Sequence, residues 1–148
     1  MAENKSLANA PHTVILDGKE YGIGEMTIGD LEQFRAAVED HVLEVGRKLL
    51  AKCTASDRTD VAAGMIRAAA GVRQFGPEWA AYFSSNEGEA IWAWLAMKRY
   101  TPGLQRRQVQ AMLENPNNAN ALADTYTLVN KDIADRLEGQ QKKDAGLL

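Results

Sequence analysis

Residues 13–34 constrain the fold more than any other segment, because they carry the signals of a short β-hairpin that leads directly into a helix. Residues 14–16, Val-Ile-Leu, have β-branched and apolar strand character. The dipeptide Asp17-Gly18 that follows is a strong two-residue hairpin turn signal, and Tyr21 and Ile23 supply the second strand. The sequence therefore predicts a β-hairpin over residues 13–26.

The rest of the chain has the apolar spacing of helices. Thr27 stands three residues before Asp30 and just ahead of apolar positions, which predicts a helix start with an acidic residue in its first turn. One apolar face then repeats at intervals of three and four, through Leu31, Phe34, Val38, Val42, Val45 and Leu49. The helices predicted in this way cover residues 28–53, 59–75, 77–83, 85–100, 105–114 and 119–138. The fold class expected is mainly α, with a small N-terminal hairpin followed by a bundle of five or six helices.

The predicted ends of several helices rest on particular residues. Gly76-Pro77 is expected to stop the second helix, Ser84 and Glu87 to form a capping box for the fourth, and Gly139 to end the last. Residues 115–118, Asn-Pro-Asn-Asn, are interpreted as a loop. Gly64 and Gly71 lie seven positions apart, which would allow another helix to approach closely there.

At 148 residues the chain is long enough for one globular domain, predicted here at residues 12–138. We expect residues 1–11 to be disordered and residues 139–148 to be a mobile tail. The net charge of -3 and the isoelectric point near 5.4 give no general attraction to nucleic acid or anionic membranes. Neither a signal peptide nor an apolar stretch of about 18 residues is apparent, which favours an intracellular soluble protein.

Residues that could perform catalysis are sparse. The two histidines, His12 and His41, have no marked partners for a catalytic triad or a metal site, and the single Cys53 excludes a cysteine-based zinc site. The glycines at 22 and 24 lack the third glycine and the parallel βαβ unit of a dinucleotide fingerprint. Carboxylates of the first helix alternate with basic residues, as on a solvated face. We therefore expect no enzymatic activity, no catalytic residues, no cofactor and no metal.

The candidate contact region lies near residues 92–107. Trp92 and Trp94 are two positions apart on a helix, a rotation of about 200°, so they cannot both face one core. One of them is expected to be partly exposed and to anchor a partner, although burial of both between flanking helices is the alternative. The polar rim of this contact is predicted to comprise Lys98, Arg99, Arg106 and Arg107. The same four cations could contact phosphates, or could simply complement helix C-termini.

Two segments resemble the tail assembly chaperones of long-tailed bacteriophages. Residues 16–21, Leu-Asp-Gly-Lys-Glu-Tyr, followed by residues 26–34, Met-Thr-Ile-Gly-Asp-Leu-Glu-Gln-Phe, are similar to the N-terminal hairpin and first helix of that family. Residues 88–104, Gly-Glu-Ala-Ile-Trp-Ala-Trp-Leu-Ala-Met-Lys-Arg-Tyr-Thr-Pro-Gly-Leu, leading into residues 109–113, are similar to a later stretch of related tail-assembly proteins. The chain departs from the family pattern at residues 22–25, Gly-Ile-Gly-Glu, where a basic residue and Pro or Leu are frequent.

The resemblance implies a non-enzymatic protein that binds the tape-measure protein, keeps it soluble and helps to recruit tail-tube subunits. Such a protein acts in the host cytoplasm, is absent from the mature virion, and binds neither nucleic acid nor membrane; self-association stays open. The leading alternative is a structural virion protein such as a head–tail connector or tail-completion subunit. A small DNA-binding regulator that uses the four cations is the third.

The resemblance also suggests a longer product. Tail assembly chaperones are often made in two lengths by programmed ribosomal slippage, and Lys142-Lys143 could be encoded by a run of adenines. If so, a long form shares residues 1 to about 143 and then diverges, which the gene sequence would show.

Overall fold

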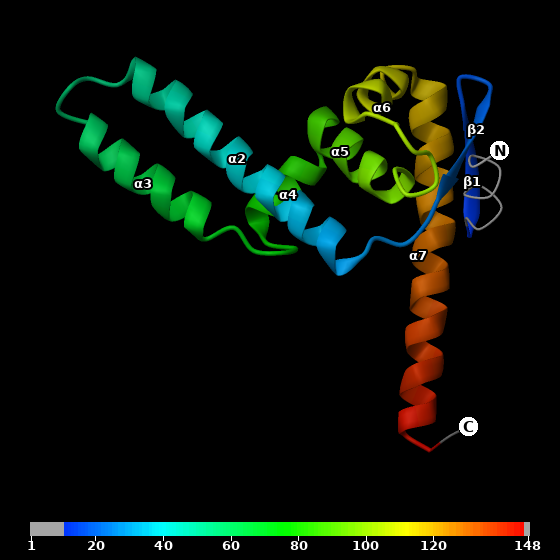
Figure 1. Cartoon of the computed structure of the whole chain (residues 1–148). Helices are drawn as coiled ribbons and strands as arrows, with labels where there is room; N and C mark the ends of the chain where they lie inside the picture. The colour runs from blue at the N-terminus through cyan, green and yellow to red at the C-terminus, as the bar shows by residue number, and fades with distance from the viewer. Residues whose placement is uncertain (1–10, 147–148) are drawn as a thin grey trace. The chain divides into compact units, whose positions relative to one another are not determined.

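The computed structural model describes residues 11–146 and is shown in Figure 1. This part of the chain is mainly helical, with an N-terminal two-stranded antiparallel hairpin followed by six helices, which confirms the predicted fold class. Its elements, in chain order, are β1 (His12–Leu16), β2 (Lys19–Ile23), α2 (Ile28–Lys52), α3 (Arg58–Ala70), α4 (Pro77–Phe83), α5 (Asn86–Met97), α6 (Arg106–Leu113) and α7 (Pro116–Asp144). The disorder predicted for residues 1–11 concerns, except for Pro11, residues outside the described range.

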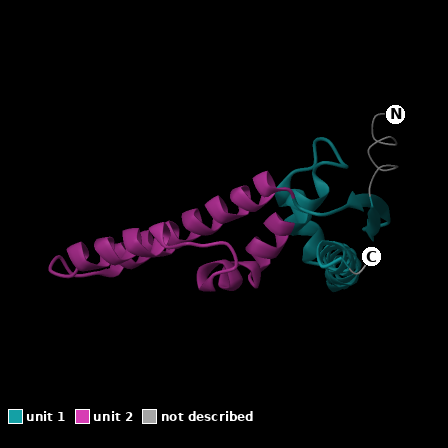
Figure 2. Ribbon diagram, turned by 90° about the horizontal axis from the view of Figure 1, so that it is seen from below, with its two compact units in different colours: residues 1–26, 93–148 teal, residues 27–92 magenta. Residues whose placement is uncertain are grey.

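The described chain divides into two compact units, whereas the sequence predicted a single domain at residues 12–138 (Figure 2). Unit 1 comprises residues 11–26 and 93–146, and unit 2 comprises residues 27–92. Each unit buries its own set of apolar side chains. Those of unit 1 pack around the hairpin, and those of unit 2 include a group of aromatic rings. In unit 2 the buried apolar residues are Phe34, Val38, Ala69, Val72, Trp79, Tyr82, Ala90 and Ile91.

The hairpin of unit 1 has the predicted turn. Asp17 and Gly18 both have positive φ, 51° and 78°, as a two-residue turn of the primed type requires, and Leu16 pairs with Lys19 across it. Along β1 burial alternates, since Val14 and Leu16 are buried whereas Ile15 is 64% exposed. The hairpin therefore turns one apolar face inward and the other to solvent.

The inward face of the hairpin packs on residues from the end of α5, from α6 and from α7. These buried contacts are supplied by Ala93, Ala96, Met97, Val109, Met112 and Leu122. Figure 1 shows β1 beside the first half of α7. A two-stranded hairpin is marginal by itself, so this packing provides most of its stability.

The buried Asn118 connects the hairpin turn to the helices. Its side-chain NH₂ donates to Asp17 Oδ1 at 2.7 Å and to the Met112 carbonyl at 2.8 Å, and its oxygen accepts from the Asp17 N–H at 3.1 Å. Asn118 is only 5% exposed, so these bonds compensate for its loss of water.

Helix α7 is longer than predicted at both ends. Asn115 is its N-cap and accepts from the Asn117 N–H at 3.0 Å, with Pro116 in the first turn, so the predicted loop at residues 115–118 is wrong. Gly139 lies inside the helix and does not end it. Residues 140–144 are therefore helical, whereas the sequence predicted a mobile tail from residue 139. The last two tail residues, 147 and 148, lie outside the described range.

In unit 2, α2 and α3 lie side by side as a helical hairpin (Figure 1). The predicted helix start is confirmed, since Thr27 Oγ1 accepts from the Asp30 N–H at 3.1 Å and Asp30 accepts from the Thr27 N–H at 3.0 Å. The close approach of the two helices occurs at Gly46, where a Cβ would overlap the Met65 side chain, and not at Gly64, whose surroundings are open.

Three further predictions about helix ends, in α3 and α5, are wrong. Helix α3 ends at Ala70 with Gly71 as its C-cap, so the helix predicted to residue 75 is too long. Pro77 begins α4 as expected. The residue that caps α5 is Ser85 instead of Ser84, because Ser85 Oγ accepts from the Gly88 N–H at 3.0 Å. Helix α5 ends at Met97, three residues before the predicted end at residue 100.

Gly88 is the position of unit 2 with the least room for a side chain. A Cβ there would overlap the Tyr82 carbonyl oxygen, a backbone atom that cannot rotate away. We expect Gly88→Ala to lower the free energy of unfolding by about 1–3 kcal/mol, measured by urea denaturation followed by tryptophan fluorescence. The matched control is Gly64→Ala, at a helical position where a Cβ would have nothing within 4 Å. This substitution should raise the free energy of unfolding by about 0.5–1 kcal/mol. Equal effects of the two substitutions would contradict the close contact at Gly88.

Asn118 generates the second prediction. Asn118→Ala removes all three of its hydrogen bonds and leaves the Met112 carbonyl without this donor. The free energy of unfolding should fall by about 1–3 kcal/mol, with loss of protection from hydrogen exchange at the Asp17 amide. Asn120→Ala, an exposed position on the same helix, is the control and should change stability by less than about 0.5 kcal/mol. A neutral Asn118→Ala would show that the hairpin does not depend on this amide.

Candidate protein-binding surfaces

The residues predicted to form one contact surface do not belong to one unit. Trp92 lies in unit 2, whereas Trp94, Lys98, Arg99, Arg106 and Arg107 lie in unit 1. Both tryptophans are half-buried, each among different neighbours. The prediction that they cannot share one core is therefore confirmed.

Trp94 braces the turn that follows α5. Its indole Nε1 donates to the Leu104 carbonyl at 2.7 Å, and the ammonium of Lys98 lies 4.8 Å from its ring centroid. The hydrogen bond spans ten residues and holds the segment between α5 and α6 against the end of α5. Trp94 thus has an intramolecular role that the sequence did not indicate.

The four predicted cations have different surroundings. Lys98 and Arg99 follow the end of α5, where positive charge complements the helix dipole. Arg106 and Arg107 are exposed at the start of α6, where the same dipole disfavours positive charge. Arg107 Nε donates only to the nearby Gln105 side chain, at 2.8 Å. Helix stabilisation therefore accounts for the first pair of cations and not for the second.

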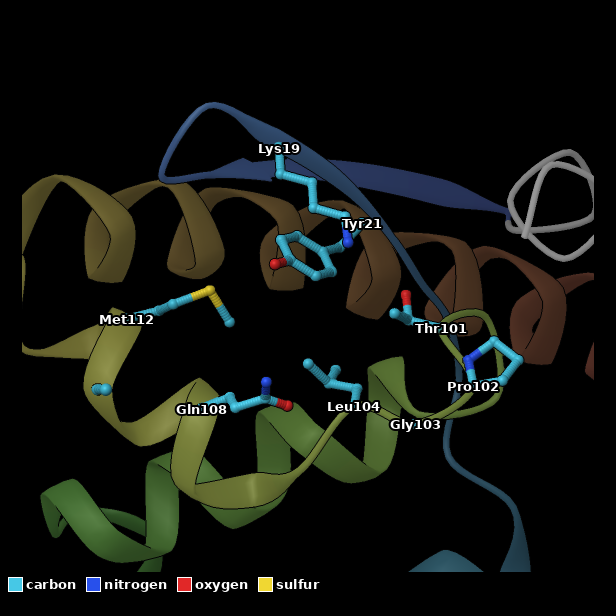
Figure 3. Close-up of a pocket in the computed structure, with 9 residues that line it drawn as sticks. Lys19, Tyr21, Thr101, Pro102, Gly103, Leu104, Gln108 and Met112 are labelled. Carbon is cyan, nitrogen blue, oxygen red and sulfur yellow. The ribbon is translucent and has the colours of Figure 1, made fainter. Parts of the chain in front are cut away.

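A pocket of about 420 Å³ opens in unit 1 between β2, the turn at residues 101–104 and α6 (Figure 3). Its apolar lining includes Tyr21, Leu104 and Met112, and its polar lining includes Lys19 and Gln108. The Lys19 ammonium lies 5.3 Å from the Tyr21 ring centroid. Among the described residues its lining includes no carboxylate, histidine or cysteine. Its apolar side chains suit the binding of an apolar group.

A smaller hollow of about 260 Å³ in unit 1 has ion pairs in its lining. His12 Nε2 lies 2.6 Å from Asp132 Oδ2, and Arg136 Nη2 contacts both carboxylate oxygens of Glu25 at 2.7 and 2.8 Å. Both pairs join the N-terminal hairpin region to α7. The sequence marked no partner for His12, and the structure places it beside Asp132.

Aromatic rings form the centre of unit 2. Phe34 is fully buried, with its ring centroid 4.5 Å from that of Trp79 and 5.1 Å from that of Trp92. Trp92 also lies 5.1 Å from Phe83 in an edge-on arrangement. Tyr82 contacts the half-buried His41, with the two ring centroids 4.7 Å apart.

The outer part of the helical hairpin formed by α2 and α3 has little core. After Val38 the one buried residue of α2 is Gly46. Val45 and Leu49, which belong to the apolar face predicted for this helix, are 44% and 55% exposed. On α3, Ile66 is 61% exposed. The apolar stripe of α2 was therefore correctly recognised, but its second half is not covered.

Within the described residues, no group of three or more His, Cys, Asp or Glu side chains is placed to hold a metal ion. No helix in residues 11–146 is both long and apolar enough to cross a membrane. No family model, curated protein or solved structure matches this chain.

The bond from Trp94 to Leu104 generates a prediction that separates a structural role from a binding role. Trp94→Phe keeps a ring at this position but leaves the Leu104 carbonyl without the indole donor. The free energy of unfolding should fall by about 1 kcal/mol, measured by urea denaturation. Arg106→Gln, an exposed position in the same unit, should change it by less than about 0.5 kcal/mol. If Trp94→Phe is as stable as the parent, the indole does not brace the turn.

Proposed function

We propose that this chain is a tail assembly chaperone of a long-tailed bacteriophage, which binds the tape-measure protein and keeps it soluble before the tail tube forms around it. It acts in the host cytoplasm through protein–protein contact and leaves the assembly before the virion is complete. The proposal is supported by the resemblance at residues 16–21, 26–34, 88–104 and 109–113 and by the apolar surface that unit 2 leaves uncovered.

The single observation that carries the proposal is the exposure of Val45 and Leu49 on α2, which we call the arm patch. The two side chains are four positions apart and so lie on the same face of the helix. A tape-measure protein is a long helical chain with apolar faces, and an exposed apolar helix face suits such a partner.

The small size of the arm patch suits reversible binding. Full burial of a Val or Leu side chain contributes about 1.5–3 kcal/mol, most of which is offset by the cost of association. A chaperone that holds many equivalent helical segments and then releases them needs weak, repeated contacts of this kind.

Recruitment of tail-tube subunits needs a second surface. For that role we assign the region of unit 1 that contains the pocket lined by Tyr21 and Met112, next to which Arg106 and Arg107 begin α6. In this assignment Arg106 and Arg107 remain part of the predicted polar rim. Binding would explain their position, because they do not stabilise the start of the helix.

The decisive experiment is deletion of the gene from the phage or prophage that encodes it, with complementation from a plasmid. Electron microscopy of the lysate should then show filled heads without tails, and the plasmid copy should restore tails. Mass spectrometry of purified particles should not detect the chain. Its presence at a stoichiometry comparable to known tail proteins would identify a structural virion protein instead, and normal tails without the gene would exclude both roles.

The arm patch gives the fourth prediction, made in the same complementation assay. Leu49→Glu places a charge on the exposed apolar face, and the phage titre should fall by at least about tenfold, as for a binding hot spot. The control is Lys48→Glu, which introduces the same acid at the neighbouring exposed position. Circular dichroism should show that both variants are folded. Equal titres for the two variants would remove the arm patch from the binding surface.

A further inference from the structure

Phe75 has two unfavourable features, a strained backbone conformation and an exposed aromatic side chain. It lies in the connection between α3 and α4 with a positive φ of 61°, and its side chain is 70% exposed. A glycine would adopt this backbone without strain, and a polar residue would expose less apolar surface. A strained residue at an exposed position points to a role in binding rather than in stabilising the fold.

Phe75 is one end of a continuous group of rings in unit 2. Its centroid lies 5.4 Å from that of Trp79, which in turn lies 6.0 Å from Trp92. Trp92 contacts Phe83, whose side chain is 39% exposed. We call the accessible members of this group, Phe75, Phe83 and Trp92, the aromatic patch.

The charge that accompanies the aromatic patch is negative. Residues 74–97 contain three glutamates and no lysine, arginine or histidine, and Arg73 is the one cation in the connection between α3 and α4. Glu78 directly precedes Trp79 in α4, and Glu89 lies three positions before Trp92 on α5, which places it on the same helix face. No ion pair of Glu78, Glu87 or Glu89 with another described residue is present.

Two carboxylates of α2, those of Glu32 and Glu39, differ from these glutamates, because both form ion pairs with Arg35. Arg35 Nε lies 3.1 Å from Glu32, and its Nη1 lies 3.2 Å from Glu39. The hydrogen bond to Glu32, followed by the charge of Glu32, raises the pKa of the Arg35 guanidinium. Glu32 and Glu39 are thus less available to a partner than the glutamates of α4 and α5.

We propose that the aromatic patch binds a cationic, amphipathic helical segment of a partner protein. The apolar side chains of that segment cover Phe75, Phe83 and Trp92, while its lysines or arginines pair with Glu78 and Glu89 or lie over the exposed ring faces. The proposal rests on the proposed function only in requiring a protein partner, and it names the chemistry of the partner segment and a surface distinct from the arm patch.

The probe is a synthetic fluorescent helical peptide of about 18 residues, roughly five turns, with leucine on one face and lysine on the other. The matched control peptide has glutamate in place of each lysine. Fluorescence anisotropy with the full chain should show binding of the leucine–lysine peptide, at least about tenfold tighter than that of the leucine–glutamate peptide. Its affinity should fall as salt is raised, because exposed charge pairs are screened.

Two variants locate the binding. Phe75→Gly removes the ring and relieves the positive φ, so we expect about tenfold weaker peptide binding with an unchanged or higher melting temperature. The double variant Glu78→Gln/Glu89→Gln keeps the side-chain volumes and should weaken binding about threefold or more and reduce its salt dependence. Leu128→Ala, which removes an apolar side chain of similar exposure from α7, should bind as the parent does.

The proposal is overturned if both peptides bind equally, or if the double variant binds the leucine–lysine peptide as tightly as the parent. That second criterion decides the matter if Phe75→Gly lowers the melting temperature. Concentration-dependent dimerisation in analytical ultracentrifugation that Phe75→Gly abolishes would also overturn it, because the patch would then bind a second copy. None of these measurements depends on phage assembly, so failure here and failure of the proposed function are distinguishable.

Discussion

The buried amide of Asn118 is the interaction on which unit 1 depends, because it ties the turn of the N-terminal hairpin to α6 and α7, which are distant in the chain. Its bond with Asp17 spans 101 positions, and its bond with the Met112 carbonyl fixes the end of α6 against the start of α7. The hairpin supplies one apolar face and no partner strand besides its own, so it persists only while that face and that amide are engaged. Unit 1 therefore closes through contacts between the two ends of the described chain.

Unit 2 is a continuous segment inserted between the two parts of unit 1, and its stability is unevenly distributed. The rings around Phe34 bury one end of α2, whereas the remainder of α2 and most of α3 have few buried residues. Helices with little tertiary packing open locally at low free-energy cost. The exposed residues Val45 and Leu49 belong to this weakly packed part, and Phe75 lies next to the well-packed rings. A partner that covers the arm patch would stabilise the weakly packed part of unit 2.

Local signals in the sequence predicted turns and helix starts well. Predictions were wrong or lacking where the structure depends on tertiary contacts. Asp17-Gly18 and Thr27 with Asp30 were sufficient because turn and cap energies arise within a few residues. The start of α7 was missed although Asn115-Pro116 is itself a helix-start signal that had been interpreted as a loop. The exposure of Leu49 and the positive φ of Phe75 could not be predicted, since periodicity shows which face of a helix is apolar and not whether another element covers it. The role of Trp94 depends on a carbonyl ten residues away, for which the sequence contains no pattern.

The continuation of α7 through Gly139 follows from the same competition between local and cooperative terms. A glycine in a helix costs about 1 kcal/mol relative to alanine, but a helix already nucleated by packing adds each further residue without a new nucleation cost. The first half of α7 is fixed by Asn118, Leu122 and Val129, which are buried. Beyond it the pair of Glu138 and Lys142, 3.3 Å apart and four positions apart, spans the glycine and offsets part of its cost. A glycine that would end an isolated helix therefore does not end a helix whose first half is packed. The length of α7 depends on the packing of its first turns more than on the residues near its end.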